Sequence, residues 1–177
     1  ASAALRRFVQ HFGLPVTIYR PDMIMPHSRY RGQINVPDML TRLLFSLVQS
    51  GVAPETFYER EADGSIARVH YDGLPVDFLA LAMLRLGSRP WSGFRTFNTI
   101  SAHVDDGVSL DTIADWIESA GYPIQRIADH GEWLRRFTER LRNLSEEQRQ
   151  HSSLELLAYV ARPQAAHGTK VRNEDFV

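Results

Sequence analysis

The sequence predicts an α/β protein, in which the last unit of a larger parallel sheet is followed by a smaller, mostly helical α/β lobe. Two observations support this class. Short β-branched and aromatic stretches alternate with segments whose apolar residues recur at helical spacing. Glycines and prolines stand at the boundaries between these stretches, where they end or begin elements.

The first predicted elements are a helix over residues 1–12, a strand over residues 16–19 and a helix over residues 37–50. One apolar stripe marks the first helix, and Gly13 ends it because glycine tolerates the left-handed backbone of a helix C-terminus. The strand is β-branched and aromatic and stops at Pro21. Pro37 suits the first turn of the second helix, and Gly51 closes it.

The remaining elements follow in alternation. Alternating patterns predict strands over residues 66–71 and 94–100, and a short strand is also predicted over residues 122–127. Helical spacing predicts a helix that follows Pro75 and is ended by Gly87, and further helices over residues 110–120 and 130–143. A last helix is predicted over residues 145–161, because Ser145 and Gln148 form a capping box. The chain after Pro163 is polar and is predicted to be a mobile tail.

These elements suggest three parts. Residues 1–35 are expected to be the C-terminal piece of a sheet-containing domain, residues 36–162 a smaller lobe, to which the family resemblance described below assigns binding of substrate and carrier, and residues 163–177 a tail. Residues 1–12 already have the character of the later turns of a helix, so we expect a piece of a longer protein.

Composition excludes several classes of function. The net charge is −1 and the pI is about 6.7, so there is no basic excess to bind a nucleic acid. No apolar run reaches the roughly 18 residues that a membrane span needs. Cysteine is absent, which fits a reducing cytoplasm and excludes thiolate chemistry. We therefore expect a cytoplasmic protein, a monomer, without nucleic-acid or membrane partners.

The stretch from Thr17 to Gly32 is the main candidate for a site. Ligands of α/β sheets bind beyond the carboxyl ends of strands, and Asp22 lies just past such an end. An ordinary exit from the strand, with Asp22 capping backbone amides of the loop, explains the same residues. A second polar loop, residues 101–107, follows the strand predicted over residues 94–100, and the two loops could face one crevice.

Other polar groups have simpler interpretations. Asp72, Asp77 and the pair Asp105 and Asp106 lie at starts of helices, where negative charge is favourable. The histidines show no metal-binding spacing, so no metal site is expected. No serine stands in a Gly-x-Ser-x-Gly motif. The arginines between residues 135 and 142 fit the solvated face of a helix, although an acidic partner could dock there.

Several segments together resemble the reductase domain of carboxylic acid reductases. They are Leu14-Pro-Val-Thr-Ile-Tyr-Arg-Pro-Asp-Met-Ile, Arg31-Gly-Gln-Ile-Asn-Val-Pro-Asp-Met-Leu-Thr-Arg, His70-Tyr-Asp-Gly-Leu-Pro-Val-Asp-Phe, Asp105-Asp-Gly-Val-Ser-Leu-Asp, Ala120-Gly-Tyr-Pro-Ile-Gln-Arg-Ile-Ala-Asp and Gln150-His-Ser-Ser-Leu. That domain is similar to extended short-chain dehydrogenases. The resemblance implies a Rossmann-like sheet in residues 1–35, NADPH as the cofactor, and a phosphopantetheinyl carrier domain as the partner that presents an acyl thioester.

The resemblance also implies roles for individual residues. It places the cofactor beside Arg20, Pro21, Asp22 and Met23, with Asp22 next to the nicotinamide, where it helps to set ring placement and whether reduction stops at the aldehyde. It places the substrate beside His27, Ser28, Tyr30, Gln33 and Asn35. The family's dinucleotide fingerprint and its Tyr-x-x-x-Lys pair are expected N-terminal to this chain. No catalytic residue is therefore expected within it, and the chain alone is expected to be inactive.

The implied reaction is reduction of a carrier-bound acyl thioester to an aldehyde. Two alternatives remain open at this stage. One is an extended short-chain dehydrogenase that acts on a nucleotide sugar, against which the stretch Gly32-Gln-Ile-Asn-Val-Pro-Asp argues. The other is an inactive fragment that only docks a carrier domain.

Overall fold

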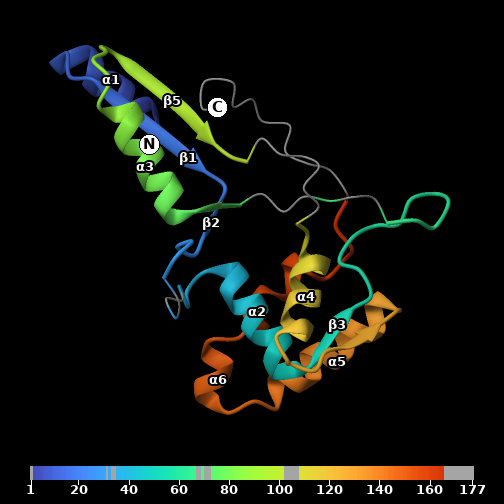
Figure 1. Cartoon of the computed structure of the whole chain (residues 1–177). Coiled ribbons are helices and arrows are strands. Elements are labelled where there is room, and N and C mark those ends of the chain that lie inside the picture. The colour runs from blue at the N-terminus through green and yellow to red at the C-terminus, as the bar shows by residue number, and fades with distance from the viewer. Residues whose placement is uncertain are drawn as a thin grey trace. The chain divides into compact units, whose positions relative to one another are not determined.

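The computed structural model describes residues 2–30, 32, 35–66, 69, 73–101 and 108–165. Its contacts divide these residues into two compact units (Figure 1). Unit 1 contains the described residues up to 32 together with 73–101, and unit 2 contains the described residues of 35–69 and 108–165. The chain therefore leaves unit 1, forms part of unit 2, returns to unit 1, and then completes unit 2.

Unit 1 is built on short parallel strand pairs. Its elements are α1 (Ser2–Phe12), β1 (Val16–Pro21), β2 (Met23–Met25), β4 (Gly73–Pro75), α3 (Val76–Gly87) and β5 (Phe94–Thr99). β1 pairs with β5 from Val16 opposite Phe94 to Pro21 opposite Thr99, and β2 pairs with β4. Because both pairs are parallel, the carboxyl ends of β1 and β5 lie at the same edge.

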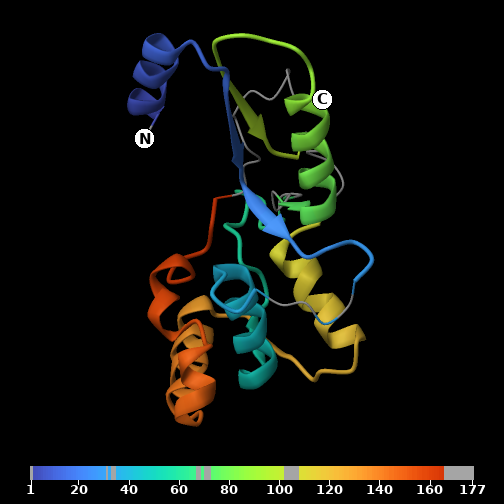
Figure 2. The ribbon, with the colours of Figure 1, turned by 90° about the vertical axis from the view of Figure 1, so that its left-hand side faces the viewer.

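The two helices of unit 1 lie on opposite sides of the β1–β5 pair (Figure 2). On the α1 side, the Arg6 guanidinium lies 4.5 Å from the centre of the Phe94 ring. On the α3 side, the Tyr19 hydroxyl donates a hydrogen bond of 3.1 Å to the Met83 carbonyl, and the Tyr19 ring stacks on Phe97. The alternation of β5 thus supplies one set of residues to each helix.

Unit 2 packs helices around one short parallel pair of strands. Its elements are α2 (Met39–Ser50), β3 (Val52–Pro54), α4 (Leu110–Ser119), β6 (Gln125–Ile127), α5 (His130–Arg142), α6 (Glu146–Gln150) and the 3-10 helix η1 (Leu154–Tyr159). β3 pairs with β6. Asp38 caps α2 by accepting a hydrogen bond from the Thr41 amide, which is why this helix begins at Met39 and not at Pro37.

An aromatic cluster forms the core of unit 2. Trp133 and Phe137 of α5 are fully buried, and their rings stack with centroids 5.1 Å apart. Phe57 meets the Trp133 ring edge-on, at 5.6 Å between centroids. The Trp133 Nε1 donates to the Val52 carbonyl of β3, so the cluster fastens α5 to the strand pair.

The structure confirms the α/β class and most helices, and it corrects several elements. β2, β3 and β4 were not predicted, because each has only three residues, too few to show a period. Of the strand predicted over residues 66–71, Ile66 forms only an isolated antiparallel bridge with Arg60. Residues 67, 68, 70 and 71 lie outside the described residues, as do residues 102–107 of the second polar loop and the tail from residue 166 onward.

The last predicted helix is broken in two. α6 ends at Gln150, and the chain bends before η1 starts at Leu154. Tertiary hydrogen bonds replace the helical ones here: the Arg42 Nε donates to the Ser152 carbonyl, and the Ser153 amide donates to the Ser46 hydroxyl. Both partners come from α2, more than 100 positions away, so no local pattern could have predicted the break.

Candidate functional site

The carboxyl ends of β1 and β5 form the edge at which a ligand of an α/β sheet would bind. Arg20 and Pro21 end β1 opposite Asn98 and Thr99 of β5. The predicted cofactor residues Arg20, Pro21, Asp22 and Met23 therefore occupy the end of β1, the bend after it and the start of β2. Asp22 is exposed at the bend, and no hydrogen bond or ion pair engages its carboxylate within the described part of the chain.

Thr99 is a polar group at this edge that the sequence analysis did not single out. It is the last residue of β5, and its side chain is completely buried. Its hydroxyl has no hydrogen-bond partner among the described residues. Buried hydroxyls are nearly always hydrogen-bonded, so an unpaired one at a ligand-binding edge is a candidate contact for a ligand. The available signal was a threonine at the carboxyl end of a strand.

A second cluster joins the loop after β2 to the first turn of α3. The Asp77 carboxylate accepts hydrogen bonds from the Ser28 amide at 3.0 Å and from the Ser28 hydroxyl at 2.5 Å. The Ser28 hydroxyl, and next the Ser28 amide, lower the pKa of Asp77 to about 2. Asp77 was expected to favour only the start of its helix, and it also holds this loop.

His27 and Tyr30 complete this cluster. Their rings lie 4.3 Å apart between centroids. The His27 Nδ1 accepts a hydrogen bond from the Arg29 amide at 3.0 Å and lies 4.0 Å from the Asp77 carboxylate.

The structure thus brings together three of the predicted substrate residues, His27, Ser28 and Tyr30. Gln33 lies outside the described residues. Asn35 belongs to unit 2, where its carbonyl accepts a hydrogen bond from the Asp38 amide just before α2. Its place relative to the His27 cluster is therefore not defined, and its substrate role stays a prediction.

Replacing Ser28 tests the cluster directly. We predict that Ser28→Ala raises the pKa of Asp77 from about 2 toward its ordinary value of 3.8, because the largest cause of the shift is the Ser28 hydroxyl. A carbon-detected NMR titration of the Asp77 carboxyl measures this pKa. Ser65→Ala is a matched control, since Ser65 likewise lowers the pKa of Asp63 and does not touch Asp77. An unchanged Asp77 pKa in Ser28→Ala contradicts the prediction.

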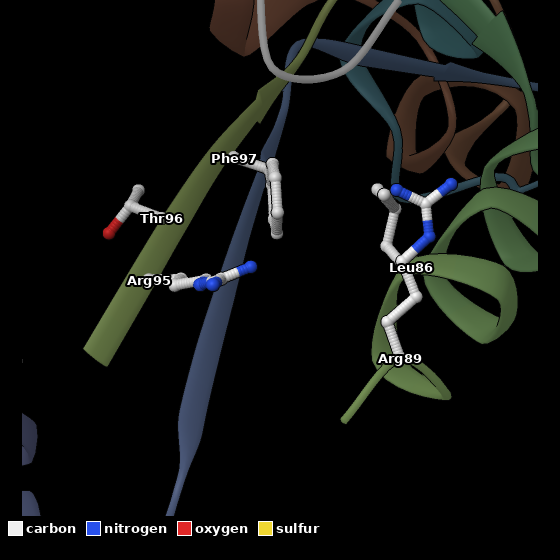
Figure 3. Close-up of a pocket in the computed structure, with 5 residues that line it drawn as sticks. All are labelled: Leu86, Arg89, Arg95, Thr96 and Phe97. Carbon is white, nitrogen blue, oxygen red and sulfur yellow. The ribbon is translucent and has the colours of Figure 1, made fainter. Parts of the chain in front are cut away.

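A separate cavity of about 500 Å³ lies between β5 and the end of α3. Figure 3 shows Arg95 and Phe97 pointing from β5 toward Leu86 and Arg89, while Thr96 points the other way. Arg95 lies near the start of β5, opposite Thr17 of β1, so this cavity is not at the carboxyl edge. The Arg95 guanidinium packs over the Trp91 ring, 5.2 Å from its centre. The sequence analysis predicted none of these lining residues.

The described residues offer neither a metal site nor a membrane-spanning helix. Within the described ranges, no group of three or more His, Asp or Glu side chains is arranged to hold a metal ion. None of the helices described is both long and apolar enough to cross a bilayer. The candidate site in unit 1 has two parts, the β1–β5 edge with Asp22 and Thr99 and the loop cluster around Asp77.

Several known proteins are similar to this chain in both sequence and fold. A family described as "Male sterility protein" matches residues 1–83. A carboxylic acid reductase of Segniliparus rugosus is 47% identical over 97% of this chain, and one of Mycobacterium marinum is 49% identical over 86% of it. The solved reductase (R) domain of a nonribosomal peptide synthetase from Mycobacterium tuberculosis is 41% identical, covers 97% of this chain and superposes with a TM-score of 0.88.

This chain is similar to carboxylic acid reductases and to the reductase domain of a nonribosomal peptide synthetase. The resemblance drawn from the sequence and the Rossmann-like α/β fold are thereby confirmed. The chain spans 14% and 13% of the two carboxylic acid reductases and 40% of the solved reductase domain. The activity, substrates and partners of these larger proteins are accordingly carried over to this chain only as a proposal.

Proposed function

We propose that this chain is the substrate-binding half of an NADPH-dependent reductase domain, which reduces an acyl thioester on a phosphopantetheinyl carrier domain to an aldehyde. The observation that carries the proposal is the joint match to carboxylic acid reductases and to reductase domains over nearly the whole chain. Carrier-domain partnership is supported by relatives that are parts of multidomain enzymes, one of them an isonitrile lipopeptide synthase of Mycobacterium tuberculosis.

The residues at the β1–β5 edge fit a nicotinamide. Its carboxamide offers N–H donors and one carbonyl acceptor. The unengaged Asp22 carboxylate accepts hydrogen bonds, and the unpaired Thr99 hydroxyl can donate one. We assign to Arg20, Pro21, Asp22 and Met23 the walls of this site. Bound NADPH would supply the hydride, and the protein would supply position and electrostatics.

The loop cluster is assigned to the thioester. Asp77 fixes Ser28, and with it the stretch that carries His27 and Tyr30. A loop that is already held in one conformation loses less conformational entropy when the phosphopantetheine arm binds. The ring nitrogens of His27 can hydrogen-bond to the phosphopantetheine arm. In the reaction, hydride addition to the thioester carbonyl carbon, with a proton given to its oxygen by an acid outside this chain, would form a hemithioacetal. Cleavage of its C–S bond, with transfer of the hydroxyl proton to sulfur, would release the free aldehyde and the carrier thiol.

Three expectations accompany this proposal and stay predictions. They are a cytoplasmic location, a monomeric state, and the assignment of residues 1–35 to cofactor and 36–162 to substrate. The structure adds that residues 73–101 pack with the first of these parts, because β5 pairs with β1. The 177-residue chain alone is expected not to reduce thioesters.

The test uses the reductase domain that contains this sequence, with a carrier domain loaded with a benzoyl thioester. We expect NADPH oxidation with release of an equal amount of benzaldehyde, slower turnover when benzoyl-CoA replaces the loaded carrier, and no turnover by the 177-residue chain alone. Absence of aldehyde, together with binding of a nucleotide sugar such as UDP-glucose, would favour the nucleotide-sugar alternative. Carrier binding without any NADPH binding would favour a docking fragment.

A further inference from the structure

Unit 2 contains a small apolar pocket to which the proposed reduction assigns no particular ligand. It holds about 140 Å³ and lies among α2, α4 and η1. Apolar side chains form most of its wall, and none of its lining residues is charged. The lining residues are Met39, Leu40, Leu43, Leu110, Ser153, Leu156, Tyr159, Val160 and Gln164.

One buried polar atom in this wall has no partner among the described residues. Ser153 is 2% exposed, and its hydroxyl makes no hydrogen bond with any described residue. Ser153 precedes η1, a position at which a serine side chain often caps a helix, yet it makes no cap bond here. Its neighbour Ser152 is equally buried, but the Ser152 hydroxyl donates to the Arg149 carbonyl at 2.8 Å. The unpaired group is therefore specific to the residue that lines the pocket.

The size and polarity of the pocket define what it can hold. An engineered cavity of about 150 Å³ in another protein binds benzene, so this pocket has room for a body of about six carbon atoms. A buried charged ligand would need a countercharge, which no lining residue supplies. A hydroxyl both donates and accepts, so Ser153 suits an alcohol, an aldehyde or a ketone.

We propose that this pocket binds a neutral organic molecule with an apolar body of about six carbon atoms and one oxygen, which hydrogen-bonds to the Ser153 hydroxyl. Leu40, Leu43 and Leu110 contact the apolar body from α2 and α4. Alcohols and aldehydes of this size are the chemical class concerned. The inference rests on unit 2 alone and does not depend on the proposed reduction.

Benzyl alcohol and toluene are matched probes, because they differ mainly by the hydroxyl group. Titration of the full 177-residue chain, followed through the methyl NMR signals of its leucines, gives both affinities. We expect both probes to shift the signals of Leu40, Leu43 and Leu110. Ser153→Ala should lower the affinity for benzyl alcohol about three- to tenfold, the usual effect of losing one hydrogen bond. It should leave the affinity for toluene unchanged. Ser152→Ala should change neither affinity beyond experimental error.

The inference is overturned if neither probe shifts these leucines, or if Ser153→Ala leaves the affinity for benzyl alcohol unchanged. A crystal structure with an ordered water on Ser153 that benzyl alcohol fails to displace would also overturn it. Should Ser153→Ala not fold, Leu43→Phe, which fills the pocket from α2, must abolish the binding of both probes. The titrations contain neither NADPH nor a carrier domain, so their results are independent of the reductase assay.

Discussion

Trp133→Ala is expected to lower the free energy of unfolding of unit 2 by about 3–5 kcal/mol, the usual cost of removing a buried large aromatic side chain. The indole is fully buried, stacks on Phe137 and meets Phe57 edge-on. Its loss leaves a large cavity and also removes the hydrogen-bond donor to the Val52 carbonyl. Because single domains are stable by only about 5–15 kcal/mol, a large share of the stability of unit 2 would be lost.

Urea unfolding followed by circular dichroism measures this effect without depending on tryptophan fluorescence. Trp116→Ala is a matched control in the same unit, because the Trp116 side chain on α4 is 56% exposed. We expect this control to change the free energy of unfolding by no more than about 0.5 kcal/mol. Equal costs for the two substitutions would mean that the aromatic cluster is not the core of unit 2.

The aromatic cluster of unit 2 shows which features of the fold sequence patterns can predict. Helical spacing predicted α5 with Leu134, Phe137 and Leu141 on its apolar face. Phe137 and Leu141 are buried, whereas Leu134 is only partly buried. It did not predict that Trp133 and Phe57 would meet, because Phe57 lies in an irregular polar stretch. β3 and β6 pair across more than 70 positions, Val52 with Gln125, and each has only three residues. Periodicity identifies faces of long elements, whereas such pairings are decided by tertiary contacts.

The candidate site likewise has one part that local sequence patterns predicted and another that depends on tertiary contacts. The strand end with Asp22 was predictable, because β-branched residues followed by a proline mark where a strand stops. The bond between Ser28 and Asp77 joins residues 49 positions apart, and nothing in either local pattern indicates it. Thr99 was assigned to a strand, but its burial without a partner depends on what packs over β5. Local patterns therefore placed the loop, and the packing revealed how the loop is held.

Asp22→Gly in the reductase domain is expected to raise the ratio of alcohol to aldehyde product on the order of tenfold, the effect of about 1.4 kcal/mol on a competing barrier. On the proposed function, the exposed Asp22 carboxylate accepts a hydrogen bond from the nicotinamide carboxamide and restrains the ring. The carrier domain positions the thioester against a restrained ring, whereas a free aldehyde must diffuse to the nicotinamide and orient itself there. A less restrained ring admits more orientations and so favours the untethered substrate.

The assay quantifies benzyl alcohol and benzaldehyde from a benzoyl-loaded carrier at matched NADPH consumption, and calorimetry gives the affinity for NADP⁺. Asp22→Asn separates charge from shape, since it retains a carbonyl acceptor and should lie between the wild type and Asp22→Gly. Glu147→Ala, at an exposed glutamate on α6 in unit 2, should behave as the wild type. If Asp22→Gly changes neither the rate of aldehyde reduction nor nicotinamide binding, then Asp22 does not contact the ring, and the bend after β1 serves only as the exit of the strand.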